Sequence, residues 1–548
     1  MASVAKKPCS LLAFTDAVVR GAGIAALVFA SALAAKEIEK DTSALPPVLS
    51  SLPETIERTL NTFNTPGASV GILHEGKTVY LAGHGLRDVE SDAPVTPDTY
   101  FYLASVSKAI TAASLGVLVQ DSKLNWDDKV TDHLPAFQLS DPWVTREFTV
   151  RDLLTHRSGL ASGAGDTMLW PAPSRFSRDE IIHNLRFLTP QSSFRSQFAY
   201  NNVMYITASA VADNLVDGQW ADLVEQRLFQ PLGMSCFAAG LPDNASDNVA
   251  NGYGYSEEQG LYAIPRNNVS EDARVWSAAG AITCNTRDML KWLSMWLTKG
   301  KTPDGQTLFE ESTFDTLISP VTPLYVSGVD KQWFQTEYSG YALGWRVTDQ
   351  FSHNVISHTG TISGYQTFVA FVPSKNLGVV VLNNGSDYGT RGAIMQTILQ
   401  AYLEPDNEQR DWIAAYSEFQ KDRQARFLAN YQQPHGSGSV LLATSEYLGH
   451  YADRWFGAIT IEKQHDKIRI QSEKMPSLAG TLEPFEDHTF VIRWDNPDAM
   501  EHAFIHFEVS TQRRVTGFTL YPYTVKEKRN HAYRDMHFTR SSEIKLND

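Results

Sequence analysis

The sequence is poor in cysteine and in positive charge, and both shortages exclude classes of function. Three cysteines in 548 residues are too few for a disulfide-rich fold or a closed zinc site. Because Cys9 falls in the N-terminal leader, the open question is whether Cys236 and Cys284 pair. The 62 acidic residues outnumber the 47 basic ones, for a formal net charge of -15. Such a protein repels a phosphate backbone, so we expect no nucleic-acid partner.

Signature motifs of two other enzyme classes are also absent from the sequence. There is no G-x-S-x-G motif, which argues against an α/β-hydrolase. There is no H-E-x-x-H motif and no paired Cys/His spacing, which argues against a metal enzyme. We therefore expect neither a metal nor another cofactor.

The N-terminus predicts a leader over residues 1–35. Lys6 and Lys7 precede an apolar stretch over residues 21–35 that ends in small residues. This pattern is typical of a secretory signal, so we expect a secreted or extracytoplasmic protein. A membrane anchor formed by the uncleaved leader is an alternative, as is an organellar or cytoplasmic location. Residues 36–54 are polar and interrupted by proline, which predicts a tether.

Residues 55–404 predict one α+β domain. Two stretches, 67–85 and 366–385, each contain a pair of apolar runs separated by a turn, which is typical of a β-hairpin. Strands at both ends with helices between them indicate a sheet completed by distant segments. The helices are expected where apolar residues recur at spacings of three and four, including 105–120, 150–156, 200–214 and 286–298.

A second, smaller domain is expected after a linker. Residues 405–439 begin as a charged helical stretch and end in a flexible segment rich in glycine and serine. From 440 to 541 the pattern changes to short alternating strands such as GAITIEK and HTFVIRW. We therefore predict a C-terminal all-β domain, either a barrel or a sandwich.

The stretch YLASVSKAIT, residues 102–111, places Ser105 three residues before Lys108 in a run that otherwise predicts a buried helix. Residues three apart share a helix face, so the lysine nitrogen can reach the serine oxygen. A buried lysine must be paired or lose its charge, and a neutral lysine would be a base beside the hydroxyl. In the alternative, Ser105 caps the helix and Lys108 extends to solvent.

Two more patterns follow along the chain. The tripeptide YNN at 200–202 precedes an apolar helix, and HTG at 358–360 stands just before the second hairpin. In this order the three patterns resemble the serine β-lactamase and penicillin-binding protein family, and most closely its class C β-lactamase, esterase and D-peptidase branch. Further landmarks of this resemblance are LLTHRSGL (153–160), LFQPLGM (228–234), AAGAITCNTRDMLKWL (278–293) and GYALGW (340–345).

The resemblance implies a β-lactamase/transpeptidase-like antiparallel sheet beside a helical lobe. It also implies that Ser105 is the nucleophile, Lys108 its base, and Tyr200 a phenol that shares the proton transfer with a pKa lowered by nearby cations. Each position has a structural alternative, such as core packing for Tyr200. The residues expected to bind substrate are Asn202, His358, Gly360, Thr361 and Trp345, with backbone N–H groups of Ser105 and Thr361 forming an oxyanion hole.

We therefore expect a serine hydrolase that acts on a small-molecule ester, lactone or amide, and most readily on an ester. An acyltransferase or transesterase and a D-stereospecific peptidase are alternatives within the same family. A non-catalytic binding protein that keeps the fold is an alternative from another class. His358 stands where the family has a lysine, so we expect only a weak positive anchor for a substrate carboxylate.

Overall fold

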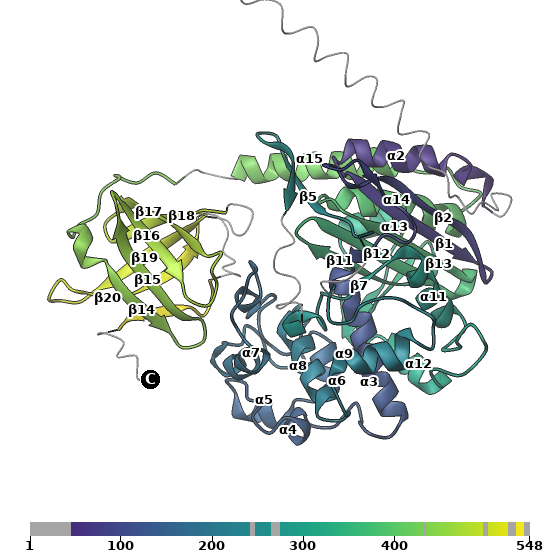
Figure 1. The fold of residues 1–548 in the computed structure, drawn as a ribbon, viewed down its shortest axis with the longest axis horizontal. Coiled ribbons are helices and arrows are strands. Elements are labelled where there is room, and N and C mark those ends of the chain that lie inside the picture. Colours follow the sequence, from purple (N-terminus) through teal and green to yellow (C-terminus); the bar gives the residue numbers. More distant parts are fainter. Residues whose placement is uncertain are drawn as a thin grey trace, which may run out of the picture.

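The computed structural model describes residues 45–241, 247–264, 274–430, 434–496, 502–523 and 533–541. The expected leader and most of the expected tether lie outside these residues. Figure 1 shows a larger unit, with a sheet next to a group of helices, and a smaller barrel connected to it by helix α15 (Trp412–Asn430). None of the helices in the described ranges combines the length and apolarity needed to cross a bilayer.

The larger unit is built on a nine-stranded antiparallel sheet, which confirms the expected fold class. The strand order is β3-β2-β1-β13-β12-β11-β10-β9-β8. Both predicted hairpins are present, and β1 pairs with β13 so that Ala68 faces Asn383. The two ends of the domain therefore meet in mid-sheet. The strands are β1 (Gly67–His74), β2 (Lys77–Asp88), β3 (Ala93–Pro94), β8 (Thr322–Pro323), β9 (Ser339–Tyr341), β10 (Arg346–Gln350), β11 (His353–Ile362), β12 (Tyr365–Val372) and β13 (Leu377–Asn383).

Helices cover both faces of this sheet, which explains why β13 has the uninterrupted apolar sequence LGVVVLN. Val379 and Val381 pack in the cluster formed with α2 (Leu52–Thr62) and α14 (Tyr388–Leu403). Val380 and Leu382 point the other way, into the cluster that contains α11 (Thr286–Leu297). Because successive strand residues alternate between faces, a strand covered on both sides must be apolar throughout.

The helical lobe surrounds α3 (Ser107–Gln120), which is buried along most of its length. The predicted helix 105–120 therefore starts two residues late, because residues 104–106 form the tighter turn η4 (Ala104–Val106). The predicted helices 150–156, 200–214 and 286–298 are present within two residues of their expected ends, whereas the charged helix expected from residue 405 begins at Trp412. The remaining helices of the domain are α4 (Val130–His133), α5 (Pro142–Glu147), α6 (Val150–Leu154), α7 (Arg178–Asn184), α8 (Asn202–Asp213), α9 (Trp220–Val224), α12 (Glu311–Ile318) and α13 (Gly328–Phe334).

Cys236 and Cys284 form a disulfide, with their Cα atoms 4.5 Å apart. This answers the question that the sequence left open. Cys284 ends strand β7 (Thr283–Cys284), which pairs with β4 (Phe101–Tyr102) just ahead of η4. The bond therefore fixes the segment after α9 beside the strand that leads into the Ser105 turn.

The C-terminal unit is a closed eight-stranded antiparallel barrel, which decides between the two predicted architectures. Its interior is filled by buried aromatic side chains, among them Phe490, Phe507 and Phe518. Closure leaves no unpaired sheet edge. The strands are β14 (Gly449–Asp453), β15 (Gly457–Gln464), β16 (Lys467–Ser472), β17 (Ala479–Glu486), β18 (Thr489–Trp494), β19 (Ala503–Val509), β20 (Val515–Pro522) and β21 (His537–Arg540).

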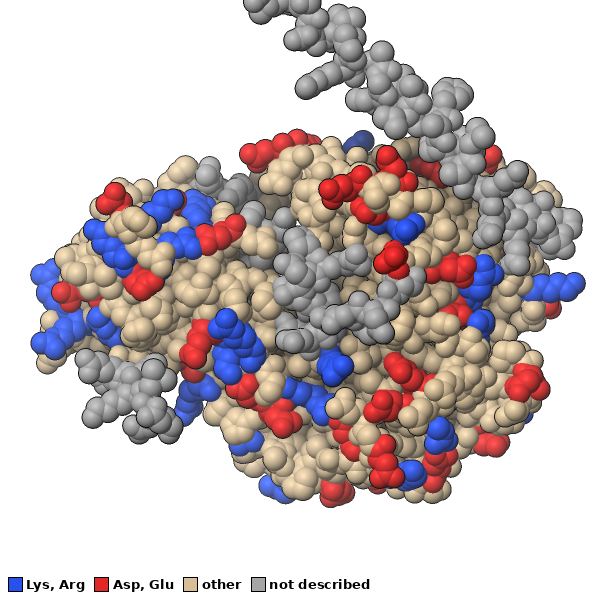
Figure 2. All heavy atoms as spheres, viewed as in Figure 1, with Lys and Arg blue, Asp and Glu red and all other residues tan. Residues whose placement is uncertain are grey.

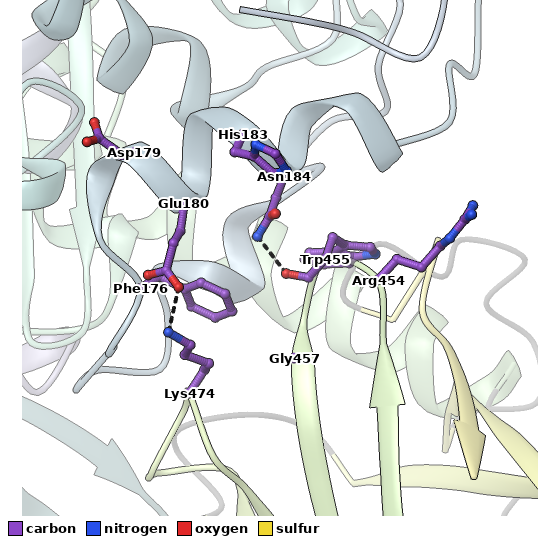
Figure 3. A pocket seen from close by; sticks show the side chains of 9 residues that line it. All are labelled: Phe176, Asp179, Glu180, His183, Asn184, Arg454, Trp455, Gly457 and Lys474. Atoms are coloured by element: carbon purple, nitrogen blue, oxygen red, sulfur yellow. Dashed lines mark hydrogen bonds and ion pairs between the residues drawn. The ribbon is translucent and has the colours of Figure 1, made fainter. Parts of the chain in front are cut away.

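The barrel docks on the helical lobe at α7 and at the segment before it, through polar contacts and through the rings of Phe176 and Phe456, whose centroids are 6.2 Å apart. Lys474 Nζ lies 2.6 Å from Glu180 Oε1, and Asn184 Nδ2 donates to Trp455 O over 2.7 Å. Figure 3 shows that each pair joins a residue of α7 to a residue of the barrel. Both pairs border a pocket of about 470 Å³ between the units. The pocket is lined by Phe176, Asp179, Glu180, His183, Asn184, Arg454, Trp455, Gly457 and Lys474.

Charged side chains of both signs are intermixed over both units on the face shown in Figure 2. Several form ion pairs, such as Arg287 Nε with Asp98 Oδ1 at 2.7 Å and Lys299 Nζ with Glu311 Oε1 at 2.6 Å. Exposed pairs of this kind contribute little to stability, so the apolar clusters provide most of it.

We expect a chain that ends at Asn430 to fold and to keep a reactive Ser105. Every residue proposed for the chemistry precedes Asn430. One apolar cluster lies wholly within the larger unit, and most members of the other also belong to that unit, although this second cluster continues into the barrel. The thermal midpoint should fall, because removal of the barrel exposes buried Phe176. Intact-mass analysis after treatment with a serine-directed phosphonate measures the outcome. A folded truncation that does not react would show that the barrel completes the pocket.

Candidate active site

Ser105 lies on the tight turn η4 between β4 and α3. Ala104, just before it, has φ 47°, in the left-handed region that non-glycine residues rarely adopt. Backbone strain of this kind collects at functional sites, where the surrounding structure holds it in place. Here Thr367 Oγ1 donates to Leu103 O over 2.9 Å, which ties the turn to β12. The turn leaves Ser105 partly exposed.

Lys108 is fully buried, which excludes the solvent-facing alternative. Its Nζ lies 3.2 Å from Ser105 Oγ, 2.7 Å from Asn202 Oδ1 and 2.6 Å from Ala279 O. A neutral amine has two N–H donors and one lone pair, whereas an ammonium has three donors and no acceptor. Asn202 and Ala279 accept the two N–H bonds. In the ammonium form the third N–H donates to Ser105 Oγ, whereas in the neutral form the lone pair is free to accept the proton of the Ser105 hydroxyl.

Lys108 is expected to lose its proton near neutral pH. Burial lowers the pKa of Lys108 to about 7, and the nearby Asp166 carboxylate opposes this effect. A general base works best when its pKa is close to the working pH, because it is then both deprotonated and basic enough. Lys108 thus meets the geometric and the electrostatic requirement for a base at Ser105.

Asn202 connects Lys108 to a carboxylate that the sequence did not predict. Its Oδ1 accepts from Lys108, and its Nδ2 donates to Asp166 Oδ2 over 2.9 Å. Asp166 begins the turn η5 (Asp166–Met168), and burial raises its pKa to about 6. The amide of Asn202 therefore joins a base and a carboxylate without direct contact between them.

Tyr200 lies beside Lys108, but its electrostatics differ from our expectation. Lys108 Nζ is 4.8 Å from the centroid of the Tyr200 ring. We expected nearby cations to lower the pKa of Tyr200. Instead burial, reinforced by Tyr341, raises the pKa well above its ordinary value, although Ser105 and Arg346 act in the opposite direction. Tyr200 is therefore a neutral phenol, able to donate a proton rather than to begin as a phenolate.

The landmark LLTHRSGL holds the loop that carries Tyr200. His156 O accepts from Ala199 N over 2.7 Å, and His156 Nδ1 accepts from Asn201 N over 3.0 Å. The His156 ring also packs on Tyr200, with centroids 4.2 Å apart. Buried Asp152 pairs with Arg195 at 2.6 Å and connects the same loop to α6. This landmark thus positions the phenol.

His358 lies in the site as a neutral side chain. Its Nδ1 donates to Thr359 O over 2.7 Å, so its Nε2 accepts from the Tyr341 hydroxyl at 3.0 Å. Burial lowers the pKa of His358 well below its ordinary value, and Arg346 and Lys108 lower it further. The ring therefore carries no charge at pH 7.

Gly360 and Thr361 lie on β11 next to the Ser105 turn, as expected. A Cβ on Gly360 would stand 2.2 Å from Leu103 O, so only glycine permits this close approach of strand and turn. Thr361 is exposed at the end of the strand. Behind it, Arg391 Nη1 donates to Thr361 Oγ1 over 2.9 Å and also to Gly360 O. These two hydrogen bonds from Arg391 fix the end of β11 that lies next to the Ser105 turn.

Trp345 does not occupy the expected place in a pocket. It is fully buried, and its ring packs against Trp296 and Phe371 with centroids 5.4 Å apart in both pairs. Alternation along the chain directs the next residue, Arg346, toward the site instead. The tryptophan of the motif GYALGW is therefore a residue of the hydrophobic core.

Three residues near the site carried no signal in the sequence. Asp166, Arg346 and Arg391 lie in no recognisable motif, and tertiary contacts alone bring them there. The Arg346 guanidinium stands 5.6 Å from the Phe198 ring and 5.8 Å from the Tyr341 ring. It has no ion-pair partner within the described part of the chain.

One group of side chains has donor atoms spaced for a metal ion. Atoms of Cys236, Cys284 and Asp288 lie within 4.8 Å of one another. The two cysteines are bonded to each other, so neither is a thiolate ligand in this state. This group does not form part of the Ser105 site.

Two protein-family models match the chain, and it is similar to several known proteins. The family model described as Beta-lactamase matches residues 54–402, and that described as Domain of unknown function (DUF3471) matches residues 440–540. Unguisins hydrolase ungD' of Aspergillus campestris is 27% identical over 482 residues, covering 83% of this chain and 86% of that protein. Protein flp of Staphylococcus aureus is 25% identical over 336 residues, covering 61% of this chain and 62% of that protein.

Solved structures show the same fold. The octameric penicillin-binding protein homologue from Pyrococcus abyssi aligns with a TM-score of 0.57 at 18% identity, covering 90% of this chain and all of that one. The D-amino acid amidase from Ochrobactrum anthropi SV3, complexed with D-phenylalanine, aligns with a TM-score of 0.52 at 20% identity, covering 68% of this chain. The first alignment extends over both units.

We expect Lys108→Ala and the volume-matched Lys108→Met to lose roughly 10²- to 10⁴-fold in kcat/KM, the usual loss when a general base is removed. Burial and the short contact with Ser105 make Lys108 the candidate base. Hydrolysis of a p-nitrophenyl acyl ester measures the effect, with circular dichroism as a check of folding. Wild-type turnover by a folded Lys108→Ala protein would mean that Lys108 has only a structural role.

Proposed function

The chain belongs to the Beta-lactamase family, and from this premise we propose that it is a serine hydrolase that forms an acyl-enzyme on Ser105. The observation that carries the proposal is the buried Lys108, whose two N–H donors are engaged and whose Nζ lies 3.2 Å from Ser105 Oγ. A serine hydroxyl is a weak nucleophile unless a base contacts it. This arrangement supplies such a base.

Acylation moves one proton and exchanges one bond. The Ser105 oxygen attacks the substrate carbonyl while its proton passes to Lys108. The bond from the carbonyl carbon to the leaving oxygen or nitrogen then breaks, and the leaving atom takes the proton from Lys108 through the Tyr200 phenol. A water molecule repeats the sequence on the ester of Ser105, which releases the acid and restores the serine.

Backbone N–H groups would stabilise the oxyanion during both steps. Ser105 opens a helical turn whose first N–H groups lack intrahelical partners. Gly360 brings β11 against that turn, and Arg391 braces the strand from behind. Each donor of an oxyanion hole typically contributes about 3 kcal/mol to the stability of the transition state. These features support the assignment of Thr361 N–H as the second donor.

We propose esters as the substrates that react fastest. An alkoxide or phenolate is a better leaving group than an amine anion, so an ester places a smaller demand on the proton donor than an amide does. Amides form the second candidate class, because amine departure needs a proton and neutral Tyr200 can provide one. The relative named as a hydrolase of unguisins supports hydrolysis as the reaction.

Other outcomes at the acyl-enzyme distinguish the remaining alternatives. An alcohol or amine that replaces water would make the protein an acyltransferase or a transesterase, and a peptide substrate with a D-residue would make it a D-stereospecific peptidase. A binding protein that keeps the fold would need no neutral lysine at Ser105. The engaged Ser105, Lys108 and Asn202 contacts favour turnover.

We expect a serine-directed phosphonate to add one equivalent of mass to the wild-type protein and to label Ser105. In Ser105→Ala the labelling should be lost, because Ser105 is the one hydroxyl in contact with Lys108 among the described residues. Intact-mass analysis followed by peptide mapping measures both results.

A matched control is Ser107→Ala, which replaces the neighbouring hydroxyl that serves as an acceptor from Ile282 N over 3.2 Å. This variant should still be labelled at Ser105. A label on another serine, or none on a folded wild-type protein, would overturn the proposed function.

We further expect kcat/KM for a p-nitrophenyl acyl ester to exceed that for a chromogenic cephalosporin at pH 7. The cephalosporin carries a carboxylate, and neutral His358 provides no positive anchor for it. A hydrogen bond to a charged group contributes roughly 1.5–3 kcal/mol, so its absence costs about ten- to a hundredfold in selectivity. His358→Lys should move the preference toward substrates that carry a carboxylate.

The same assay in Arg346→Gln serves as the control, since Arg346 has the largest effect on His358 among the cations Arg346, Lys108 and Arg391. If the wild type prefers the cephalosporin and Arg346→Gln does not, Arg346 recognises the carboxylate. In that case the preference for uncharged esters is wrong.

A further inference from the structure

Asp166 is a buried acidic group next to the site that the reaction steps above do not use. One of its oxygens, Oδ2, accepts from Asn202 Nδ2 over 2.9 Å. The other, Oδ1, is buried without a hydrogen-bond partner among the described residues. A carboxylate held in this way costs folding free energy, so its retention beside a base calls for an explanation.

Asp166 determines which way round the Asn202 amide lies. A carboxylate only accepts hydrogen bonds, so the Asn202 group that faces it must be the NH₂ group. The carbonyl oxygen of Asn202 is then directed at Lys108, 2.7 Å from Nζ. If the amide were reversed, its NH₂ group would oppose the N–H donors of Lys108 and compete for the lone pair that Ser105 needs.

The charge of Asp166 acts on Lys108 through the same connection. The carboxylate favours the ammonium form of Lys108 and so opposes the effect of burial on the lysine pKa. Because Asn202 lies between them, the two groups do not form a direct ion pair. A direct pair would hold the proton on the lysine more strongly.

We propose that Asp166 is a positioning residue that acts through Asn202, fixing the amide orientation and the protonation of Lys108 for the reaction at Ser105. This inference rests on the proposed function, since it concerns the base of that same reaction.

The other titratable groups around Lys108 are uncharged at neutral pH. Tyr200 and Tyr205 face Lys108 from the loop before α8 and from α8 itself, and burial raises the pKa of both phenols. His156, after α6, and His358, on β11, interact with Lys108, and burial lowers the pKa of both rings well below the ordinary value. Asp166 is therefore the anionic group whose removal should change the titration of Lys108.

The test is the pH dependence of kcat/KM for a p-nitrophenyl acyl ester between pH 5 and 9. In the wild type the rate should rise with pH as Lys108 loses its proton, near its pKa of about 7. Asp166→Asn keeps an acceptor for Asn202 but removes the charge. The Lys108 pKa then falls, so the acid limb, the part of the profile where the rate rises with pH, should move to lower pH. A nearby opposite charge shifts a pKa by about one to three units, and we expect a shift of about one unit here. At pH 6, where wild-type Asp166 is itself partly protonated, the rate relative to the plateau should rise by up to about fivefold.

Asp166→Ala removes both the charge and the acceptor. It should show the same displacement of the acid limb and, in addition, a plateau rate at least about tenfold lower, because the Asn202 amide is no longer fixed. In an Asn202→Ala background, Asp166→Asn should shift the limb by less than it does in the wild type, since the two residues act as a unit.

Asp179→Asn is the matched control, because Asp179 is an exposed acid of the same lobe. Its pH profile should equal that of the wild type. Should Asp166→Asn fail to fold, Asp166→Ser provides a second neutral residue with an acceptor oxygen.

An unmoved acid limb in a folded Asp166→Asn or Asp166→Ser protein would overturn the inference. Phosphonate labelling of Ser105 in the same preparation separates this result from failure of the function. A labelled variant with an unmoved limb contradicts only the role of Asp166, whereas an unlabelled wild type contradicts the function itself.

Discussion

The site depends on the burial of one lysine. Lowering the Lys108 pKa from 10.5 to about 7 corresponds to roughly 5 kcal/mol, which the rest of the fold must offset. The surroundings meet the needs of the neutral amine, with two acceptors for its N–H groups and a hydroxyl for its lone pair. A carboxylate in direct contact would have restored the charge. Instead the Asn202 amide contacts Lys108, and the Asp166 carboxylate lies behind that amide.

This local chemistry requires segments that lie far apart in the sequence. Ser105 and Lys108 come from η4 and α3, Asn202 from α8, and the carbonyl of Ala279 from the segment before β7. The antiparallel sheet provides the fixed reference, because β1 and β13 join the two ends of the domain in mid-sheet. On β11, Gly360 then lets the strand contact the serine turn at a distance that no side chain would allow.

The sequence predicted the residues that belong to motifs and missed those defined by tertiary contact. Ser105, Lys108 and Tyr200 stand at the starts of elements, where spacing and order are visible along the chain, and the two hairpins and the main helices follow from apolar periodicity. Asp166 and Arg391 act across the fold, so no local pattern marks them. Trp345 belongs to a recognised landmark, yet only the structure shows that its ring packs in the core.

The predicted lowering of the Tyr200 pKa is wrong for a physical reason. From the sequence, a tyrosine near a lysine suggests a phenol with a lowered pKa, because a cation favours the phenolate. In the structure burial lowers the pKa of Lys108 to about 7, so the lysine is only partly charged at neutral pH, and burial also disfavours the phenolate directly. Neighbouring groups in a buried site therefore tend to become neutral together. Transfer of the Ser105 proton to neutral Lys108 creates an ammonium and an oxyanion. The ammonium is stabilised by the acceptors Asn202 Oδ1 and Ala279 O, and the oxyanion needs backbone N–H donors.

The barrel approaches this site through the segment that begins at Asp166. Ser174 Oγ donates to Met168 O over 2.6 Å, which ties the segment back to η5. Six residues after Asp166, Ala172 O accepts from Ser477 Oγ of the barrel over 2.6 Å, and Arg175 N donates to Lys474 O over 2.8 Å. Docking of the barrel thus restricts the turn that carries the carboxylate. A domain that supplies no proposed chemical group can in this way still affect the base, because the position of Asp166 governs the Asn202 amide and, through it, Lys108.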